Sequence, residues 1–228
     1  MRKFILPAFA VLVSLLALST LSSCNEELDG MDPAIELYQQ YEVIVTDKAK
    51  AAYANFRIGS AAGERVQLTD GSWIMMNAMS AYYQQSISAT DPEFNYITVL
   101  DSLHKSVNFV FHRAKDKDIV NSVSIADLPS VEIPDSVESV ENGSPVPLEL
   151  GSVNPMNIDV ILSSESLTGS VYHAQYTPVG FVFNSVPAGN YTLVADYVKV
   201  TPTENNDGKA GGSITVIRRK FRNLVTVR

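Results

Sequence analysis

The sequence predicts an all-β protein in which two sandwich domains follow an N-terminal export segment. From residue 34 onward, apolar residues alternate with polar ones over short stretches bounded by Gly, Asn, Asp and Pro, a pattern typical of half-buried strands rather than helices. A Pro-rich stretch at residues 129–147 cannot hold a continuous central strand and divides the chain. Removing residues 1–23 from the 228 leaves 205, enough for two domains.

The first twenty-four residues have the layout of an export signal. Arg2 and Lys3 give a basic start, residues 4–18 form an apolar run, and small residues lead to Cys24, the single cysteine. The apolar run is shorter than the roughly twenty residues that a membrane-spanning helix needs. We therefore expect residues 1–23 to be a cleaved signal peptide, which would leave Cys24 at the new N-terminus.

The sequence Leu21-Ser22-Ser23-Cys24 resembles the lipobox of bacterial lipoproteins. The resemblance implies a diacylated cysteine sulfur, an acylated amine, and a mature protein anchored to the membrane by chains such as palmitate. Two or more acyl chains give lasting attachment, because each buried CH₂ contributes about 0.8 kcal/mol. The alternative is an ordinary secretory signal in which Cys24 is incidental.

Residues 24–33 are acidic and turn-rich, so they are expected to form a flexible tether. Glu26, Glu27 and Asp29 resemble the surface-export signal of Bacteroidota lipoproteins, which implies an outer-membrane lipoprotein facing the cell surface. Asn25 stands where an aspartate retains other lipoproteins at the inner membrane. The alternative is a solvated leader that carries no address.

Composition excludes several classes of partner and site. Arg2 and Lys3 are the only charged residues of the removed segment, so 17 − 2 = 15 basic and 25 acidic side chains remain, a formal charge of −10. An acidic surface disfavours nucleic acid and anionic lipid. With the one cysteine used by lipid, no internal disulfide and no cysteine metal site is expected, and no cofactor is predicted.

The first domain is expected over residues 34–134. Its clearest element is a hairpin, in which Val107, Phe109 and Phe111 share one face before a charged turn and the run 119–125. The other candidate strands of this half are 41–45, 52–58, 66–68, 73–76, 81–87 and 94–100.

Residues 135–144 are expected to be a linker, and residues 145–228 a second sandwich. Its candidate strands are 146–150, 157–162, 171–176, 180–184, 191–200, 214–218 and 224–227. Their number and spacing fit one compact sandwich.

One corner of the second half has a recognisable sequence. Phe181 and Phe183 lie on one side of a strand, residues 187–190 supply a turn, and Tyr191 with Leu193 returns to the same core. The stretch resembles the F-x-F-x-x-V-P-A-G-x-Y-T-L signature of prealbumin-like and other immunoglobulin-like modules. It implies two tandem immunoglobulin-like β-sandwich domains, of the kind that serve exported bacterial proteins as spacers, stalks or binding units.

Motifs for chemistry are absent from the sequence. It contains no Gly-x-Ser-x-Gly, His-Glu-x-x-His, Walker or Gly-x-Gly-x-x-Gly motif. His104, His112 and His173 are expected at the surface or rim, so we predict neither an enzyme nor a metal site. Residues 205–212 have calcium-loop composition without the spaced acidic series, and we expect a mobile hairpin loop there.

Aromatic residues are the candidates for a binding face. Trp73, Tyr82, Tyr83 and Tyr96 offer stacking platforms for sugar rings or anchors for a protein partner. Tyr82 and Tyr83 are successive strand residues, so one of them should point outward. The alternative is that these residues complete the core.

Arg218, Arg219, Lys220 and Arg222 form the one dense basic cluster. It could meet an acidic partner subunit, a lipid phosphate or an acidic glycan. The alternative is a solvated turn between strands 214–218 and 224–227.

Two short sequences resemble the O-glycan acceptor of exported Bacteroidota proteins. They are Asp101-Ser102-Leu103 and Asp135-Ser136-Val137. The resemblance implies glycosylation at Ser102 and Ser136.

Together these features predict a non-catalytic, lipid-anchored envelope protein that acts as a surface binding or structural, adhesive module. One alternative is an accessory glycan-binding lipoprotein of a nutrient-uptake system. Another is a fimbria-like subunit, which would need a strand that is exchanged between protomers.

Overall fold

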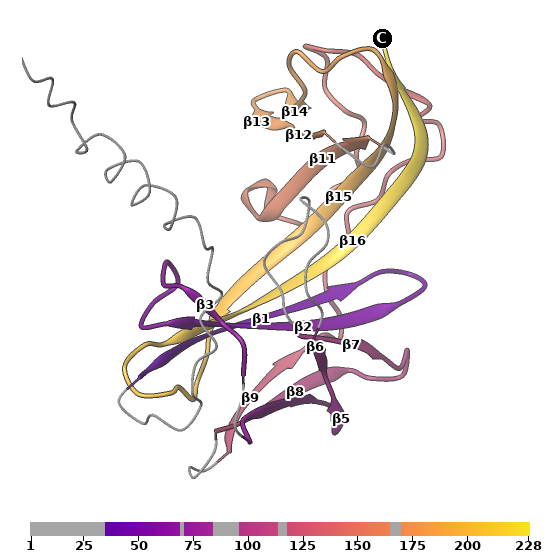
Figure 1. Ribbon diagram of the computed structural model, residues 1–228. Coiled ribbons are helices and arrows are strands. Elements are labelled where there is room, and N and C mark those ends of the chain that lie inside the picture. The colour runs from indigo at the N-terminus through magenta and orange to yellow at the C-terminus, as the bar shows by residue number, and fades with distance from the viewer. Residues whose placement is uncertain (1–34, 69–70, 84–95, 114–117, 165–169) are drawn as a thin grey trace, which may run out of the picture.

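The computed structural model describes residues 35–68, 71–83, 96–113, 118–164 and 170–228. Within them the chain is nearly all β, with a ten-stranded, a four-stranded and a two-stranded sheet. The one helical element described is the 3-10 turn η1 (Pro155–Asn157). The predicted all-β class is confirmed (Figure 1).

The ten-stranded sheet runs the length of the molecule. Its order is β12-β11-β15-β16-β1-β2-β7-β6, with β10 paired to β16 and β3 paired to β2. Its strands are β1 (Leu37–Val45), β2 (Lys50–Ile58), β3 (Arg65–Val66), β6 (Tyr82–Tyr83), β7 (Tyr96–Leu100), β10 (Ser139–Val140), β11 (Ile158–Ser164), β12 (Val171–His173), β15 (Gly189–Pro202) and β16 (Gly212–Val227).

Two smaller sheets pack beside it. The four-stranded sheet has the order β5-β4-β8-β9 and the two-stranded sheet is β13-β14. Their strands are β4 (Trp73–Met76), β5 (Met79–Ser80), β8 (Ser106–His112), β9 (Ile119–Ser124), β13 (Gln175–Thr177) and β14 (Gly180–Val182).

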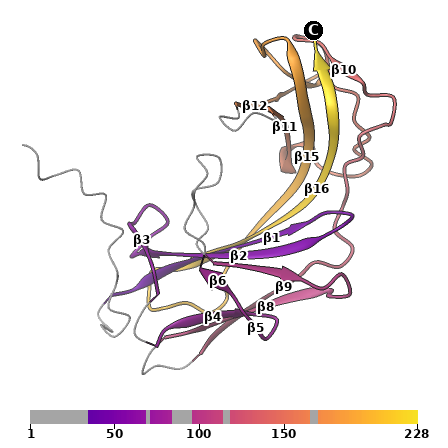
Figure 2. The ribbon, with the colours of Figure 1, turned by 45° about the vertical axis from the view of Figure 1, so that its right-hand side comes forward.

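The long hairpin β15–β16 belongs to both halves of the molecule. The first half of β16 pairs in parallel with β1, and its end pairs with β10. Figure 2 shows the two strands curving together from one half to the other. The register shifts opposite Tyr191 and Leu193, and Leu224 has a φ of 60°. This bulge moves the buried positions of β16 from even to odd numbers, which keeps both ends facing a core.

The first hydrophobic cluster lies between the large sheet and the four-stranded sheet. Tyr41 of β1 stacks on Phe109 of β8 with ring centroids 4.3 Å apart, and Phe56 of β2 contacts Phe111 at 4.5 Å. All four rings are fully buried, and burying each contributes about 1.5–3 kcal/mol. The first half of β16 also joins this cluster. Val107, Phe109 and Phe111 share the buried face of β8, as predicted.

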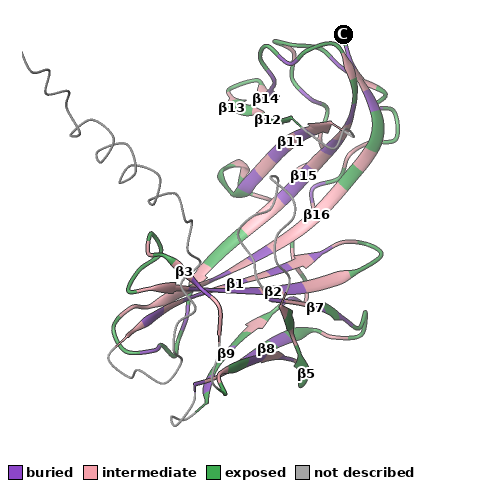
Figure 3. Cartoon of the chain, viewed as in Figure 1, coloured by how far each residue is buried: buried purple, intermediate pink, exposed green. Residues whose placement is uncertain are grey.

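The second cluster covers the other half of the same sheet. Val160 and Leu162 of β11, Leu193 of β15 and Val225 of β16 pack with Phe183. The segment that follows β9 covers them, together with β14. Phe181, Phe183, Tyr191 and Leu193 all belong to this cluster, so the prediction that they face one core is confirmed. The predicted strand 180–184 is shorter in the structure, because β14 ends at Val182. In Figure 3 the buried residues recur along the strands of both halves.

Several predicted strands differ in the structure. Residues 146–150 form no strand, because prolines interrupt the segment, and only the isolated bridges Glu132↔Glu149 and Pro145↔Val182 occur there. The predicted strand 171–176 is split into β12 and β13, which lie in different sheets. The prediction of separate strands at 214–218 and 224–227 is wrong, because both lie within β16.

The expected linker, residues 135–144, is packed in the structure. Val137 and Val140 are 3% exposed and belong to the second cluster, and β10 pairs with β16. The chain leaves the first cluster after Leu128 and enters the second at Val131. The valines between the prolines are buried, and composition alone does not reveal this.

Candidate functional site

A groove of about 520 Å³ opens at the edge of the first cluster. It lies where the chain changes sheets, since β5 pairs with β4 whereas β6 pairs with β7. Among the residues that the structure describes, no charged side chain lines it; the lining residues are Met79, Ser80, Tyr82, Ile97, Thr98 and Val99. Tyr82 is 77% exposed and Val99 is 69% exposed. Large apolar side chains this accessible are typical of a binding surface.

The groove also borders an open strand edge. β2 pairs with β7 as far as Leu100, whereas β6 pairs only with Tyr96 and Ile97. Among the described residues, the outer edge of β7 from Thr98 to Leu100 therefore has no strand partner. Such an edge can accept an extended peptide.

The predicted binding aromatics have different environments. Tyr82 points outward and Tyr83 is half-buried against Tyr96, which confirms that one of the two is exposed. Tyr96 is 6% exposed and its hydroxyl accepts a hydrogen bond from the Leu68 amide at 2.7 Å. Burial raises the pKa of Tyr96 to about 12. The prediction that Tyr96 is an exposed platform is wrong, because its ring completes the core.

Trp73 is 37% exposed on β4 and stacks on His112 with ring centroids 4.7 Å apart. His112 Nδ1 lies 2.6 Å from Asp118 Oδ1. These three side chains form one ladder on the four-stranded sheet, so Trp73 does not line the groove beside Tyr82.

The histidines lie apart, each with its own oxygen partner. His173 Nδ1 is 3.0 Å from Asp159 Oδ1, and His104 Nδ1 is 3.3 Å from the Asp101 carbonyl oxygen. Over the part of the chain that the structure describes, no three His, Cys, Asp or Glu side chains gather as metal ligands.

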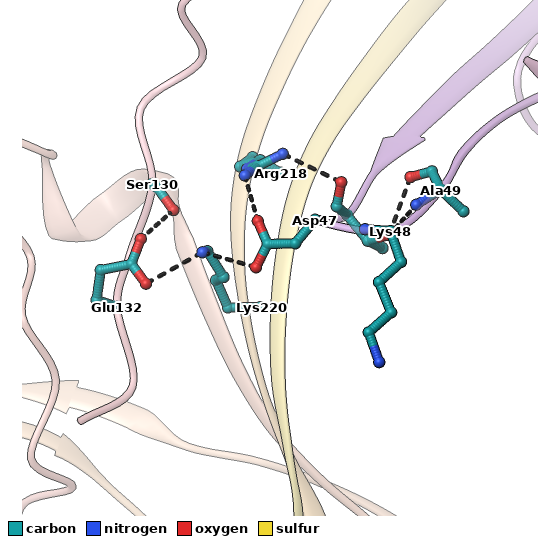
Figure 4. Close-up of polar contacts among 8 residues, drawn as sticks. Asp47, Lys48, Ala49, Ser130, Glu132, Arg218 and Lys220 are labelled. Atoms are coloured by element: carbon teal, nitrogen blue, oxygen red, sulfur yellow. Dashed lines mark hydrogen bonds and ion pairs between the residues drawn. The ribbon is translucent and has the colours of Figure 1, made fainter. Parts of the chain in front are cut away.

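The basic cluster of β16 is paired with acidic groups of the same chain. Arg218 donates to Asp47 Oδ1 at 2.6 Å and to the Thr46 carbonyl oxygen at 3.3 Å. Lys220 contacts Asp47 at 2.8 Å and Glu132 at 3.1 Å. Figure 4 shows Asp47 held between the two cations. The hydrogen bond from Lys220 lowers the pKa of Asp47, and the same bond raises the pKa of Lys220.

The remaining cations of the cluster are also paired. Arg219 forks onto Asp196 with its shortest contact at 2.7 Å, and Arg222 bonds Asp135 Oδ1 at 2.9 Å and the Asp135 carbonyl oxygen. The interpretation of this cluster as a turn is wrong. Its cations connect β16 to the β1–β2 turn, to β15 and to the segment that enters the second cluster.

The loop between β15 and β16, residues 203–211, is docked on the first cluster and is not the mobile loop that its composition predicts. Asp207 is 8% exposed and accepts from Arg113 at 2.6 Å and from the Leu37 amide at 2.9 Å. Asn205 and Asn121 exchange side-chain and backbone hydrogen bonds at 2.8 and 2.9 Å. Sequence reasoning missed Arg113 and Asp207, because partners so distant along the chain leave no local signal.

The two predicted glycan acceptors differ in accessibility. Ser102 lies in a turn where Leu103 is 83% exposed, and the Ser102 carbonyl oxygen accepts from Lys50 at 2.5 Å. Ser136 is exposed, but Val137 beside it is buried in the second cluster. Only the motif Asp101-Ser102-Leu103 has all three of its residues exposed to an enzyme.

Comparison with known proteins finds no matching family model, no matching curated protein and no matching solved structure. The described residues include no helix of sufficient length and hydrophobicity to cross a membrane. Cys24, Glu26, Glu27 and Asp29 lie outside the described residues.

Proposed function

We propose that the chain is a non-catalytic, lipid-anchored protein of the cell envelope that binds a neutral ligand in the groove beside Tyr82. The observation that carries the proposal is a groove whose described lining residues carry no charge, in an otherwise acidic chain, with Tyr82 77% exposed at its wall. A phenol ring offers a flat apolar face on which a sugar ring can stack. Because none of the described lining residues is a cation, an acidic ligand would gain no ion pair from them.

The lipobox-like sequence that ends at Cys24 supports the lipid anchor. Acylation of Cys24 would hold the protein at the outer membrane, and Glu26, Glu27 and Asp29 would direct it to the cell surface, as in the Bacteroidota lipoproteins that the sequence resembles. The chain would consist of two immunoglobulin-like units that share the β15–β16 hairpin, and not of two separate tandem domains. Two separate hydrophobic clusters support this form.

The binding test compares two exposed tyrosines. Tyr82→Ala should lower the affinity for a neutral oligosaccharide about tenfold, equivalent to about 1.4 kcal/mol, measured by calorimetry over a panel of neutral glycans. Tyr176→Ala is the matched control, because Tyr176 is 50% exposed on the second cluster. Equal affinity of the Tyr82→Ala variant and the unchanged chain, or no binding to any glycan of the panel, would contradict the proposal.

The anchoring test uses protease shaving of intact producing cells, followed by mass spectrometry. Loss of both clusters from the cells, with acylated Cys24 left in the membrane, is the expected result. Cys24→Ser should release the protein from the membrane fraction. An unmodified Cys24 would contradict the anchor, and protection from protease would place the protein on the periplasmic side.

A second candidate function is that of a fimbria-like subunit, favoured by the open edge of β7 from Thr98 to Leu100. A strand from another protomer would pair there and bury Val99. Size-exclusion chromatography of the unchanged chain should then show polymers, and Val99→Lys should abolish them because an edge charge opposes strand pairing. A monomer at all concentrations would remove this candidate.

Glycosylation at Ser102 is proposed as a surface modification. Intact-mass analysis of protein from the native host should show added hexose mass that Ser102→Ala removes. The Ser136→Ala variant should keep that mass.

A further inference from the structure

We propose that the parallel pair β1–β16 makes the fold resist tension between the N-terminal side of β1 and the second cluster. The inference rests on the proposed function only for the source of tension, which is the lipid anchor on the N-terminal side of β1. The strand geometry that resists tension is independent of it.

Strand direction sets how the pair is loaded. β1 and β16 run parallel over seven residue pairs, from Gln39↔Gly212 to Val45↔Arg218. Tension that enters at the start of β1 and leaves at the end of β16 pulls the two strands in opposite directions along their axes. The backbone hydrogen bonds of the pair are then strained together. Pulling both strands from one end would break the same bonds one after another, which needs less force at each step.

The ends of the chain suit this loading. Figure 1 shows the C-terminus at the end of the second cluster that lies farthest from the start of β1. β16 continues as one strand from its pairing with β1 into the second cluster, with one bulge at Leu224, and β15 accompanies it from Pro202↔Ser213 to Gly189↔Val227. A pull on the second cluster is thus delivered along β16.

The register of the pair is locked where tension enters. Asp207, in the loop before β16, accepts the Leu37 amide at 2.9 Å and is held by Arg113 at 2.6 Å. Arg113 is 3% exposed and Asp207 is 8% exposed, so water screens this pair poorly. Glu36 adds a contact from its Oε2 to the Lys209 amide at 2.9 Å. Sliding β1 along β16 must break these contacts first.

A second lock lies at the other end of the pair. Asp47, in the turn after β1, receives Arg218 Nη2 at 2.6 Å and Lys220 Nζ at 2.8 Å, both from β16. These side chains are partly exposed, and a static exposed ion pair contributes little to stability. Under shear, however, both contacts join the two strands that slide, so displacement of β1 by one residue, about 3.3 Å, stretches both of them.

Single-molecule force spectroscopy tests the proposal with two pulling geometries. The full chain carries Cys24→Ser and is pulled either between its N- and C-termini or between its N-terminus and a thiol introduced by Lys209→Cys, an exposed position. The first geometry shears β1–β16, and the second opens the pair from one end. At equal loading rate, the rupture force between the two termini should be higher than the rupture force between the N-terminus and residue 209. Forced unfolding is governed by the unfolding barrier, and shear must strain all the bonds of the pair together.

Asp47→Ala should lower the rupture force between the termini and leave the Lys209 geometry almost unchanged. Asp118→Ala is the matched control, since it removes an exposed aspartate paired with His112 on the four-stranded sheet. Equal forces in the two geometries, or equal effects of Asp47→Ala and Asp118→Ala, would overturn the proposal. A higher rupture force between the termini, together with an unmodified Cys24 in cells, would support the shear resistance of β1–β16 and contradict only the lipid anchor.

Discussion

The two hydrophobic clusters share one sheet but obtain their strands differently. The first combines residues 37–125 with the first half of β16, whereas the second is built from residues 131–227 alone. The first also contains the buried pair Arg113–Asp207 and the buried amides of Gln39 and Asn121. The first cluster therefore depends on the C-terminal hairpin β15–β16 for its completion, although most of its residues come earlier in the chain.

Truncation should have the largest effect. A chain that ends at residue 134 keeps every strand of the expected first domain but loses β16 and Asp207, which leaves one edge of β1 unpaired and Arg113 buried without that carboxylate. We expect circular dichroism and proton NMR to show an unfolded chain. Residues 129–228 should keep a folded second cluster. Cooperative thermal unfolding of the shorter chain would refute the dependence of the first cluster on β16.

The buried ion pair should give the next largest effect. Asp207→Ala removes the carboxylate that Arg113 and the Leu37 amide contact, and removing one partner of a buried ion pair costs about 3–5 kcal/mol. Asp159→Ala, which removes an exposed partner of His173, should cost less than about 1 kcal/mol. Urea denaturation measures both. Similar losses in the two variants would mean that the docked loop adds nothing to the first cluster.

A matched pair of valines on β16 separates the clusters. Val216 and Val225 are both buried, the first at 1% exposure and the second at 0%, but they belong to different clusters. Truncation of either to Ala should cost about 2 kcal/mol. Hydrogen exchange should quicken in β1 for Val216→Ala and in β11 for Val225→Ala. Equal changes across both regions would show one cooperative unit.

Local patterns predicted most strands but none of the long-range pairings. The alternation of Val107, Phe109 and Phe111 depends on neighbours along the chain, so it was readable directly. The run from Arg218 to Arg222 resembled a solvated turn because its counter-ions, among them Asp47, come from distant segments. The continuity of β16 depends on those partners and could not be inferred from the run itself.

The groove was predictable only in part. Strand alternation predicted that either Tyr82 or Tyr83 is exposed, but Met79 and Val99 became its neighbours because the chain changes sheets between β5 and β6. A change of sheet depends on the competing partners β4 and β7. Tyr96 is the opposite case: its sequence context allowed an exposed ring, but the ring is buried in the core.

Two turn residues give the smallest and most discriminating test. Ala78 follows β4 in the first half with a φ of 63°, and Ser185 lies in the second half with a φ of 61°. Glycine adopts this region without the steric cost of a Cβ, so Ala78→Gly and Ser185→Gly should each stabilise the protein by about 0.5–1 kcal/mol. Calorimetry would then show whether each variant raises one shared melting temperature or only that of its own cluster. Ala78→Gly and Ser185→Gly could instead raise two different melting transitions, one for each cluster. In that case the hairpin β15–β16 would connect the two clusters without making them unfold together.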